Sequence, residues 1–334
     1  MHRTARYPAR PDVSVIIVNW NSHEFLSLCL RSIFATSGTL KFEVIVIDNG
    51  SYDGSEELVR HDFPQVVFVQ GLENLGFARA NNAAADRATG RNFLFLNPDT
   101  EVIGAAIERM VRFLDERPEA GAVGCKLLNS DGSLQTSCVQ AFPTIANQVL
   151  DAEVLRWTFP RLRLWGTHAF LQERVEPAQV EALSGACILV ERGAFLEVGR
   201  FTEAYFMYAE DMDLCFKLQE AGRCNYYLGD ASVIHHGGQS SGASQESQFG
   251  NVLMRESIAE FLRLRRGPRY ARAYRVALAL SALVRIAAFW LARVVSLGSY
   301  KPGVVSRGLR KWSRVLRWTV GAEPWVRNPA ARSH

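Results

Sequence analysis

Apolar runs of strand length alternate with segments of helical spacing over the first hundred residues. Strands are expected at 13–18, 42–47, 66–69 and 93–96, and helices at 25–35, from Ser55 onward and at 79–88. Strand–helix–strand order favours parallel pairing through right-handed crossovers. The pattern therefore predicts an α/β fold, a doubly wound and mainly parallel sheet with helices on both faces. Periodicity is weak at about 130–180 and returns at 182–191 and 209–221.

Polar turns follow several of these strands directly. Asn97-Pro98-Asp99 ends the apolar run 93–96. Ligands of open α/β sheets collect at the carboxyl ends of the strands, and a carboxylate there can hold a divalent cation against a diphosphate. Asn-Pro-Asp is also ordinary turn chemistry. Asp99 is thus a candidate ligand residue, with a plain β-turn as the alternative.

Two further carboxylate turns have the same character. Asp48 follows the strand 42–47 and could accept hydrogen bonds from a ribose or base edge, or act as a turn or helix N-cap carboxylate. Glu210, Asp211 and Asp213 occupy the first turn of a helically spaced segment, where the helix macrodipole favours acids in any case. A carboxylate near apolar groups can have its pKa raised and act as a general base.

Two weaker signals remain. Gly76, in Asn74-Leu75-Gly76-Phe77, precedes a helix whose N-terminus could meet a phosphate. His235 and His236 follow an apolar run, where a histidine can ligate a metal, although adjacent histidines often belong to a turn.

In combination these motifs resemble the inverting family 2 glycosyltransferases, which have the GT-A fold. The resemblance covers about residues 13–240 and is closest to the rhamnosyltransferases that use dTDP-L-rhamnose. It rests on five segments in order: Val15-Ile16-Ile17-Val18-Asn19-Trp20-Asn21, Asp48-Asn49-Gly50-Ser51, Asn74-Leu75-Gly76-Phe77-Ala78, Asn97-Pro98-Asp99 and Ala209-Glu210-Asp211-Met212-Asp213.

The resemblance implies a role for each matching position. Asp211 is expected to be the catalytic base. Asp99 is expected to bind Mg²⁺ or Mn²⁺ with His236, although Asn97 stands where a second acid is common. The nucleotide sugar is expected to contact the following residues: Asn19, Asp48, Asn74, Gly76, Phe77, Asn81, Asn97, Asp99 and Glu210.

The implied reaction is transfer of L-rhamnose from dTDP-rhamnose, with inversion. The acceptor would be a hydroxyl of a glycan or a polyprenyl-diphosphate-linked saccharide in cell-envelope polysaccharide synthesis. Alternatives are another nucleotide sugar, such as a UDP-hexose or UDP-galactofuranose, a sugar-nucleotide pyrophosphorylase, and a non-catalytic membrane scaffold. A pyrophosphorylase should carry a Gly-rich signature and a basic residue near the first strand, where this chain has Asn19-Trp20-Asn21.

Charge divides the chain unevenly. Residues 261–320 hold 14 Lys and Arg and no acid, whereas residues 1–260 hold 22 basic and 33 acidic residues. The basic region 241–334 is expected to be helical, separate from the catalytic domain 13–240, and to have an anionic partner. It lacks a nucleic-acid reading motif, so no nucleic-acid partner is expected.

A membrane surface is the expected partner of this region. Residues 276–295 are mostly apolar, but their longest run without a charged residue is nine residues, 276–284, so an interfacial helix is predicted rather than a spanning one. Packing on the enzyme's own body, or homo-oligomerisation through the C-terminal helices, is the alternative. Scattered cysteines without a C-x-x-C pair, and a polar 1–12 without a signal-like apolar run, predict a cytoplasmic protein, peripheral on the inner face of the membrane.

Overall fold

The computed structural model describes residues 10–36, 38–150, 155, 158–159, 162–166, 176–237, 246–296 and 302–327. Residues 1–9, which belong to the segment where no secretory signal is expected, lie outside this range. The strands are β1 Val13–Asn19, β2 Phe42–Asp48, β3 Val67–Gln70, β4 Asn92–Leu96, β5 Thr100–Ile103, β6 Ala120–Leu128, β7 Val139–Gln140, β8 Ala178–Val180, β9 Ala182–Leu183, β10 Cys187–Glu191 and β11 Cys224–His235. The helices are α1 His23–Thr36, α2 Ser55–Asp62, α3 Phe77–Ala85, α4 Ala106–Asp115, α5 Ile145–Val149, α7 Arg192–Glu197, α8 Glu210–Glu220, α9 Glu246–Arg266, α10 Pro268–Val295 and α11 Pro302–Thr319.

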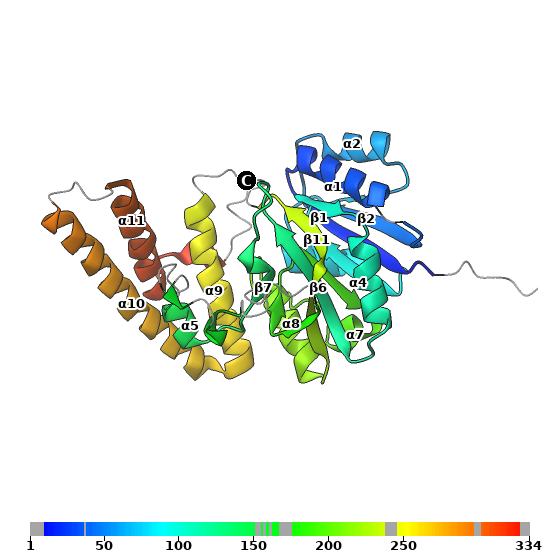
Figure 1. Cartoon of the computed structure of the whole chain (residues 1–334). Coiled ribbons are helices and arrows are strands. Elements are labelled where there is room, and N and C mark those ends of the chain that lie inside the picture. The colour runs from blue at the N-terminus through cyan, green and yellow to red at the C-terminus, as the bar shows by residue number, and fades with distance from the viewer. Residues whose placement is uncertain are drawn as a thin grey trace, which may run out of the picture. The chain divides into compact units, whose positions relative to one another are not determined.

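The chain divides into two compact units (Figure 1). The first, here the sheet unit, comprises 1–142, 161–203 and 210–240; the second, the helical unit, comprises 143–160, 204–209 and 241–334. Two short segments that precede residue 240 are thus grouped with the C-terminal helices. The proposed division into 13–240 and 241–334 stays a prediction.

The sheet unit is built on a sheet whose described strands run in the order β3-β2-β1-β4-β10-β6-β11-β5, with β8 on β11. β1 pairs in parallel with β2 and β4, so their carboxyl ends meet at one edge, with Asn19 opposite Asp48. α3 packs against β1 and β2, and α4 packs against β6 and β11. The predicted α/β architecture is confirmed.

The other half of the sheet differs from a simple doubly wound pattern. β10 is antiparallel to both β4 and β6, and β11 runs antiparallel to β5. Apolar runs show that these segments are buried, but they carry no information on strand direction. The sheet is therefore mixed, and β11 brings residues near 235 to the end of β5.

An aromatic cluster behind β4 holds the strand that leads into Asp99. The Phe95 ring lies 4.7 Å from Phe201 and 5.0 Å from Phe195, and all three side chains are fully buried. Burial contributes roughly 1.5–3 kcal/mol for each such side chain. The turn after β4 is thus anchored by a rigid core.

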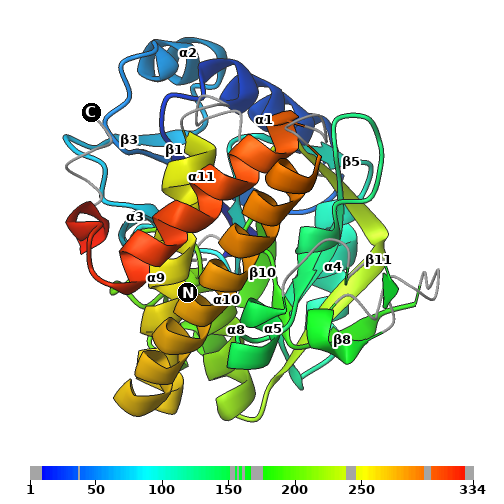
Figure 2. The same cartoon turned by 90° about the vertical axis from the view of Figure 1, so that its left-hand side faces the viewer.

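The helical unit consists of α9, α10 and α11 with the short α5. α10 packs along α11, and both contact α9; Figure 2 shows α10 and α11 side by side. Tyr274 of α10 and Trp318 of α11 are buried in this packing, with ring centroids 6.3 Å apart.

Candidate functional site

The first polar cluster lies where β1 and β2 end. Asp48 is fully buried, and its carboxylate accepts hydrogen bonds from the Ser51 amide at 2.6 Å, Gln70 Nε2 at 2.9 Å and Asn19 Nδ2 at 2.8 Å. Three donors hold this carboxylate in one orientation. Asp48 therefore organises the loop, and a ligand would meet the residues around it as well as its own oxygens.

Two buried amide oxygens in this cluster have no hydrogen-bond partner among the described residues: Asn19 Oδ1 and Asn49 Oδ1. The Asn49 amide nitrogen is used, because it donates to Asn74 Oδ1 at 3.2 Å and to the Gly76 carbonyl at 3.3 Å. Buried polar atoms are nearly always paired, so two unpaired acceptors at one strand edge indicate that a donor from outside the chain belongs there.

The segment that follows enters α3 through a glycine. Gly76 has φ 78°, a conformation that disfavours other residues, and its amide donates to Asn74 Oδ1 at 2.9 Å. Asn81 is buried and donates to the Phe77 carbonyl of its own helix at 3.0 Å. The predicted nucleotide contacts of Asn74, Gly76, Phe77 and Asn81 stay predictions, and Asn81 has a local structural partner.

Asp211 begins a second cluster. It lies in the first turn of α8, and its carboxylate accepts hydrogen bonds from the Gly185 amide and from the Met212 amide, both at 2.8 Å. A Cβ at Gly185 would lie 3.3 Å from the Asp211 Cβ and 3.6 Å from the Phe77 ring, so glycine permits this close approach. Removal from water raises the pKa of Asp211 despite the two amides that lower it.

The neighbouring acids of α8 are placed differently. Asp213 is fully buried and accepts a 2.5 Å hydrogen bond from the Thr202 hydroxyl, with Lys217 Nζ 3.9 Å away. Glu210 is also buried. Asp213 ties α8 to the preceding loop, whereas Asp211 faces a glycine backbone beside an aromatic ring.

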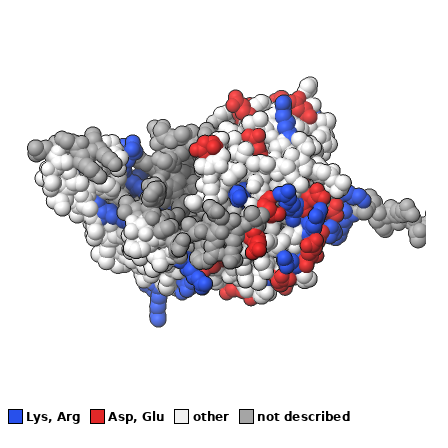
Figure 3. Space-filling model, viewed as in Figure 1, with Lys and Arg blue, Asp and Glu red and all other residues white. Residues whose placement is uncertain are grey.

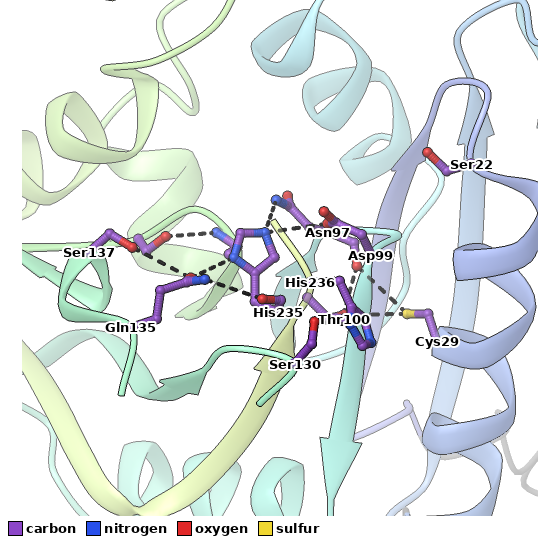
Figure 4. A network of polar contacts seen from close by, with 12 residues as sticks. Ser22, Cys29, Asn97, Asp99, Thr100, Ser130, Gln135, Ser137, His235 and His236 are labelled. Atoms are coloured by element: carbon purple, nitrogen blue, oxygen red, sulfur yellow. Dashed lines mark hydrogen bonds and ion pairs between the residues drawn. The ribbon is translucent and has the colours of Figure 1, made fainter. Parts of the chain in front are cut away.

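The third cluster lies beyond β4 (Figure 4). Asp99 is 4% exposed, and its Oδ1 lies 3.4 Å from Nε2 of His235, while Asn97 Nδ2 lies 3.3 Å from the same nitrogen. The Asn97 carbonyl accepts the Thr100 hydroxyl at 2.7 Å, which holds the turn. A carboxylate, an amide and an imidazole nitrogen therefore converge at the end of one strand.

Gln135 sets the tautomer of this imidazole in its neutral form. Gln135 Nε2 donates to Asn129 Oδ1 at 2.9 Å and to the His235 carbonyl at 3.2 Å, which leaves its Oε1, an acceptor, 2.7 Å from His235 Nδ1. The proton of neutral His235 must then be on Nδ1. The lone pair of Nε2 is consequently directed toward Asn97 and Asp99.

His236 points the other way. Successive side chains of a strand alternate between faces, and His236 contacts Glu101 Oε1 at 2.7 Å through Nε2 and Ser130 Oγ at 2.8 Å through Nδ1. Its backbone amide donates to the Asp99 carbonyl at 2.9 Å. The metal role of His236 stays a prediction, but it is His235 whose imidazole faces the Asp99 carboxylate.

Comparison with known proteins identifies the family. The model of "Glycosyl transferase family 2" matches residues 14–199. The chain belongs to glycosyltransferase family 2. An N-acetylglucosaminyl-diphospho-decaprenol L-rhamnosyltransferase from Mycobacterium tuberculosis is 35% identical over 219 residues, which cover 62% of this chain and 70% of that protein. The rhamnosyltransferase WbbL from Escherichia coli K12 is 23% identical over 233 residues, covering 67% and 83% of the two chains.

Solved structures support the fold of this glycosyltransferase. The mannosyltransferase PcManGT from Pyrobaculum calidifontis, solved with GDP-Man and Mn²⁺, superposes with a TM-score of 0.59 at 18% identity and covers 95% of this chain and 87% of its own. GalNAc-T7, solved with UDP, GalNAc and Mn²⁺, gives a TM-score of 0.52 at 15% identity over 69% and 44%. The expected GT-A fold is confirmed.

The donor set of the glycosyltransferase fits a divalent cation with few protein ligands. Within the residues that the structure describes, no group of three or more His, Cys, Asp and Glu residues could hold a metal. Asp99 and His235 Nε2 nevertheless offer one oxygen and one unprotonated nitrogen to a shared position, and water and phosphate oxygens commonly complete such coordination.

Three residues of this site lack a sequence signal. Gln135 lies 100 positions from His235, in the stretch without clear periodicity, and Gly185 reaches Asp211 across 26 positions. Gln70 is the last residue of a short strand. The histidine pair was visible, but choosing between the two rings required the register of β11 on β5, where His235 is opposite Thr100.

Proposed function

We propose that this family 2 glycosyltransferase transfers L-rhamnose from dTDP-L-rhamnose, with inversion, to a hydroxyl of a polyprenyl-diphosphate-linked saccharide or a related cell-envelope glycan. The observation that carries the proposal is the approach of the Asp99 carboxylate to Nε2 of His235 after β4, in the unit that also holds the desolvated Asp211. The names of the two rhamnosyltransferase relatives support rhamnose as the transferred sugar, and that of the Mycobacterium tuberculosis protein supports the acceptor class.

The nucleotide would occupy the edge formed by β1 and β2. The unpaired oxygens of Asn19 and Asn49 are acceptors, and the N–H of a pyrimidine base or a ribose hydroxyl is the donor that they lack. Gln70 and Ser51 keep Asp48 in place beside them. These residues support binding of a nucleotide rather than a particular base or sugar.

Asp99 and His235 would hold the divalent cation. A nitrogen ligand favours Mn²⁺ over Mg²⁺, because Mg²⁺ prefers oxygen ligands in near-ideal octahedral geometry. When bound, such a cation neutralises the charge that develops on the departing diphosphate. Gln135 keeps the proton of His235 on Nδ1, and Asn97 supplies an amide where a second carboxylate would add negative charge.

Asp211 would act as the general base. The acceptor oxygen attacks the anomeric carbon from the face opposite the diphosphate, the bond from that carbon to the diphosphate oxygen breaks, and the acceptor proton moves to Asp211. The amides of Gly185 and Met212 orient its carboxylate, and desolvation brings its pKa closer to the working pH. A single displacement of this kind inverts the anomeric configuration.

The proposed place of action is the cytoplasmic face of a membrane with anionic lipid, because a lipid-linked acceptor lies there while the donor is soluble. The basic composition of 261–320 supports this location. Homo-oligomerisation through the C-terminal helices stays a prediction.

Donor profiling tests the proposal. The full-length protein would be incubated with a synthetic polyprenyl-diphosphate-linked N-acetylglucosamine and, in separate reactions, with dTDP-L-rhamnose, UDP-galactofuranose, a UDP-hexose and GDP-mannose, each with Mn²⁺, with Mg²⁺ and with EDTA. We expect mass spectrometry to show addition of a deoxyhexose only in the reaction with dTDP-L-rhamnose. NMR of that product should show an inverted anomeric configuration. Transfer from a different donor alone would overturn the rhamnose assignment, and full activity in EDTA would overturn the metal site.

A further inference from the structure

The long helix α10 exposes large apolar side chains to solvent, which a helix that only packs on its own protein would bury. Eight large apolar side chains along its C-terminal two-thirds are 50–75% exposed. We call them the outer face of α10: Val276, Leu280, Leu283, Val284, Trp290, Leu291, Val294 and Val295. At 100° per residue they lie within an arc of about 140°.

The opposite side of α10 carries the polar groups, and these are engaged inside the helical unit. Arg285 donates to the Val149 carbonyl at 2.8 Å, and its guanidinium lies 4.3 Å from the centroid of the Trp312 ring. Arg275 pairs with Glu256 at 2.6 Å and lies over Trp318. Leu278 is fully buried on this side.

The packed side of α10 also holds apolar side chains. Leu278 is fully buried there, and Phe289 lies against Gly308 of α11, where an added Cβ would be 2.4 Å from the ring. Arg275 and Arg285 are directed inward by their partners. The packed side of α10 therefore carries both polar and apolar side chains, whereas the eight large apolar side chains of the outer face are exposed to solvent.

Contiguous exposed apolar surface marks an interaction site. Figure 3 shows the surface over this helix largely white, with isolated basic groups. Exposed Arg269 and Arg272 stand one to two turns before Val276, and Arg293 lies near the end of the helix. A second copy of the chain would bring these like charges together, whereas an anionic lipid surface would pair with them.

By length and composition α10 is, among the described helices, the one that could cross a membrane. If α10 crossed the membrane, Arg285 and its partners on α5 and α11 would lie inside the hydrocarbon region. A spanning helix would also need apolar side chains around its whole circumference. The outer face covers less than half of the circumference, which suits a helix lying in the plane of the interface.

From these observations we infer that the outer face of α10 inserts into the headgroup boundary of an anionic bilayer, with Arg269, Arg272 and Arg293 at the lipid phosphates. The inference deepens the proposed membrane location, on which it rests. It assigns attachment to apolar side chains of one helix, with the basic residues as the accompanying electrostatic contribution.

Vesicle flotation of the full-length protein tests it. The vesicles would consist of phosphatidylcholine alone or mixed with phosphatidylglycerol. We expect Leu283→Gln/Leu291→Gln to reduce binding to the anionic vesicles by about tenfold or more, since each leucine loses its apolar burial. The matched control, Leu72→Gln/Leu196→Gln, alters two exposed leucines of the sheet unit and should bind as the wild type does. Equal binding by the Leu283/Leu291 variant would overturn the inference.

Three further measurements distinguish interfacial insertion of the outer face from a membrane span and from contact with a second copy of the chain. Binding that persists in high salt supports apolar insertion, because salt screens the headgroup attraction alone. Resistance of the bound protein to carbonate extraction would overturn the interfacial mode in favour of a span. Sedimentation that shows a dimer abolished by Leu283→Gln/Leu291→Gln, without vesicle binding by the wild type, would overturn lipid in favour of a second copy.

Transfer to a water-soluble acceptor fragment distinguishes this inference from the proposed function. We expect the Leu283/Leu291 variant to retain this transfer activity, because the outer face of α10 would serve only in membrane attachment. A wild-type protein that floats with vesicles but transfers no sugar would remove the proposed activity and leave the attachment surface supported.

Discussion

The polar side chains of the sheet unit and the apolar side chains of α10 are in opposite situations. In the sheet unit, Asp48 and Asp213 are buried and His235 is half-buried, and each has partners that hold it in one orientation. On α10 the large apolar side chains of the outer face are exposed, although Arg275 and Arg285 of the same helix pack against neighbouring helices. Fully paired buried groups indicate a preorganised site, and uncovered apolar groups indicate a surface that is completed by something else.

The largest effect is expected at Asp211, the desolvated acid of the sheet unit. Asp211→Asn removes the proposed base and should lower kcat by about a thousandfold or more, since general-base catalysis contributes roughly 10²–10⁴-fold. Donor affinity should be retained, and kcat together with donor-induced thermal shifts would measure both. An unchanged kcat in a folded, donor-binding variant would show that the base lies elsewhere.

The raised pKa of Asp211 also predicts a dependence on pH. Folded protein holds this proton more tightly than unfolded chain, so the contribution of Asp211 to stability is present at low pH and is lost as pH rises through its raised pKa. The melting temperature of Asp211→Asn at neutral pH should therefore not fall below that of the wild type. Activity of the wild type should decline on acidification at a higher pH than an ordinary aspartate would cause.

The next effect separates the two adjacent histidines. His235→Ala should weaken Mn²⁺ binding by about a hundredfold, and Gln135→Leu by roughly tenfold to a hundredfold, because a partner that orients a ligating histidine contributes on that scale. His236→Ala, which loses contacts to Glu101 and Ser130, is the matched control and should retain Mn²⁺ affinity. Mn²⁺ titration followed by calorimetry in the presence of dTDP gives a readout independent of turnover. A larger loss of Mn²⁺ affinity in His236→Ala than in His235→Ala would restore His236 as the ligand.

Asp213 sharpens the distinction between paired and reactive acids. Asp213→Asn disturbs the contacts with Thr202 and Lys217 and should lower the free energy of unfolding by about 2 kcal/mol, as expected for a buried hydrogen-bonded charge. The folded fraction should retain most of its transfer rate, unlike Asp211→Asn. Chemical denaturation and kcat per folded molecule would measure the two quantities. A loss of kcat as large as that of Asp211→Asn would give Asp213 a part in the reaction.

The smallest effect tests which side of α10 is packed against the other helices. Arg285→Ala loses the hydrogen bond to Val149 and the contact with Trp312 and should cost about 1–2 kcal/mol of stability. Leu283→Gln, two positions away on the outer face, should leave the melting temperature unchanged. Calorimetry of both variants without lipid would measure the difference. A greater loss for Leu283→Gln would mean that the outer face is packed in the free protein.

The sequence by itself determined the alternating strands and helices, the strand-end positions of Asp48 and Asp99, and the first-turn position of Asp211. These follow from local rules, because an apolar run ended by a polar turn means the same in any fold. Only the tertiary structure decided that β10 runs antiparallel to β4 and β6 and β11 antiparallel to β5, that His235 rather than His236 faces Asp99, and that Gln135 orients it. The side of α10 left uncovered was decided in the same way. Each of these depends on the register or packing of segments far apart in the chain, and a local pattern is the same whichever partner it meets.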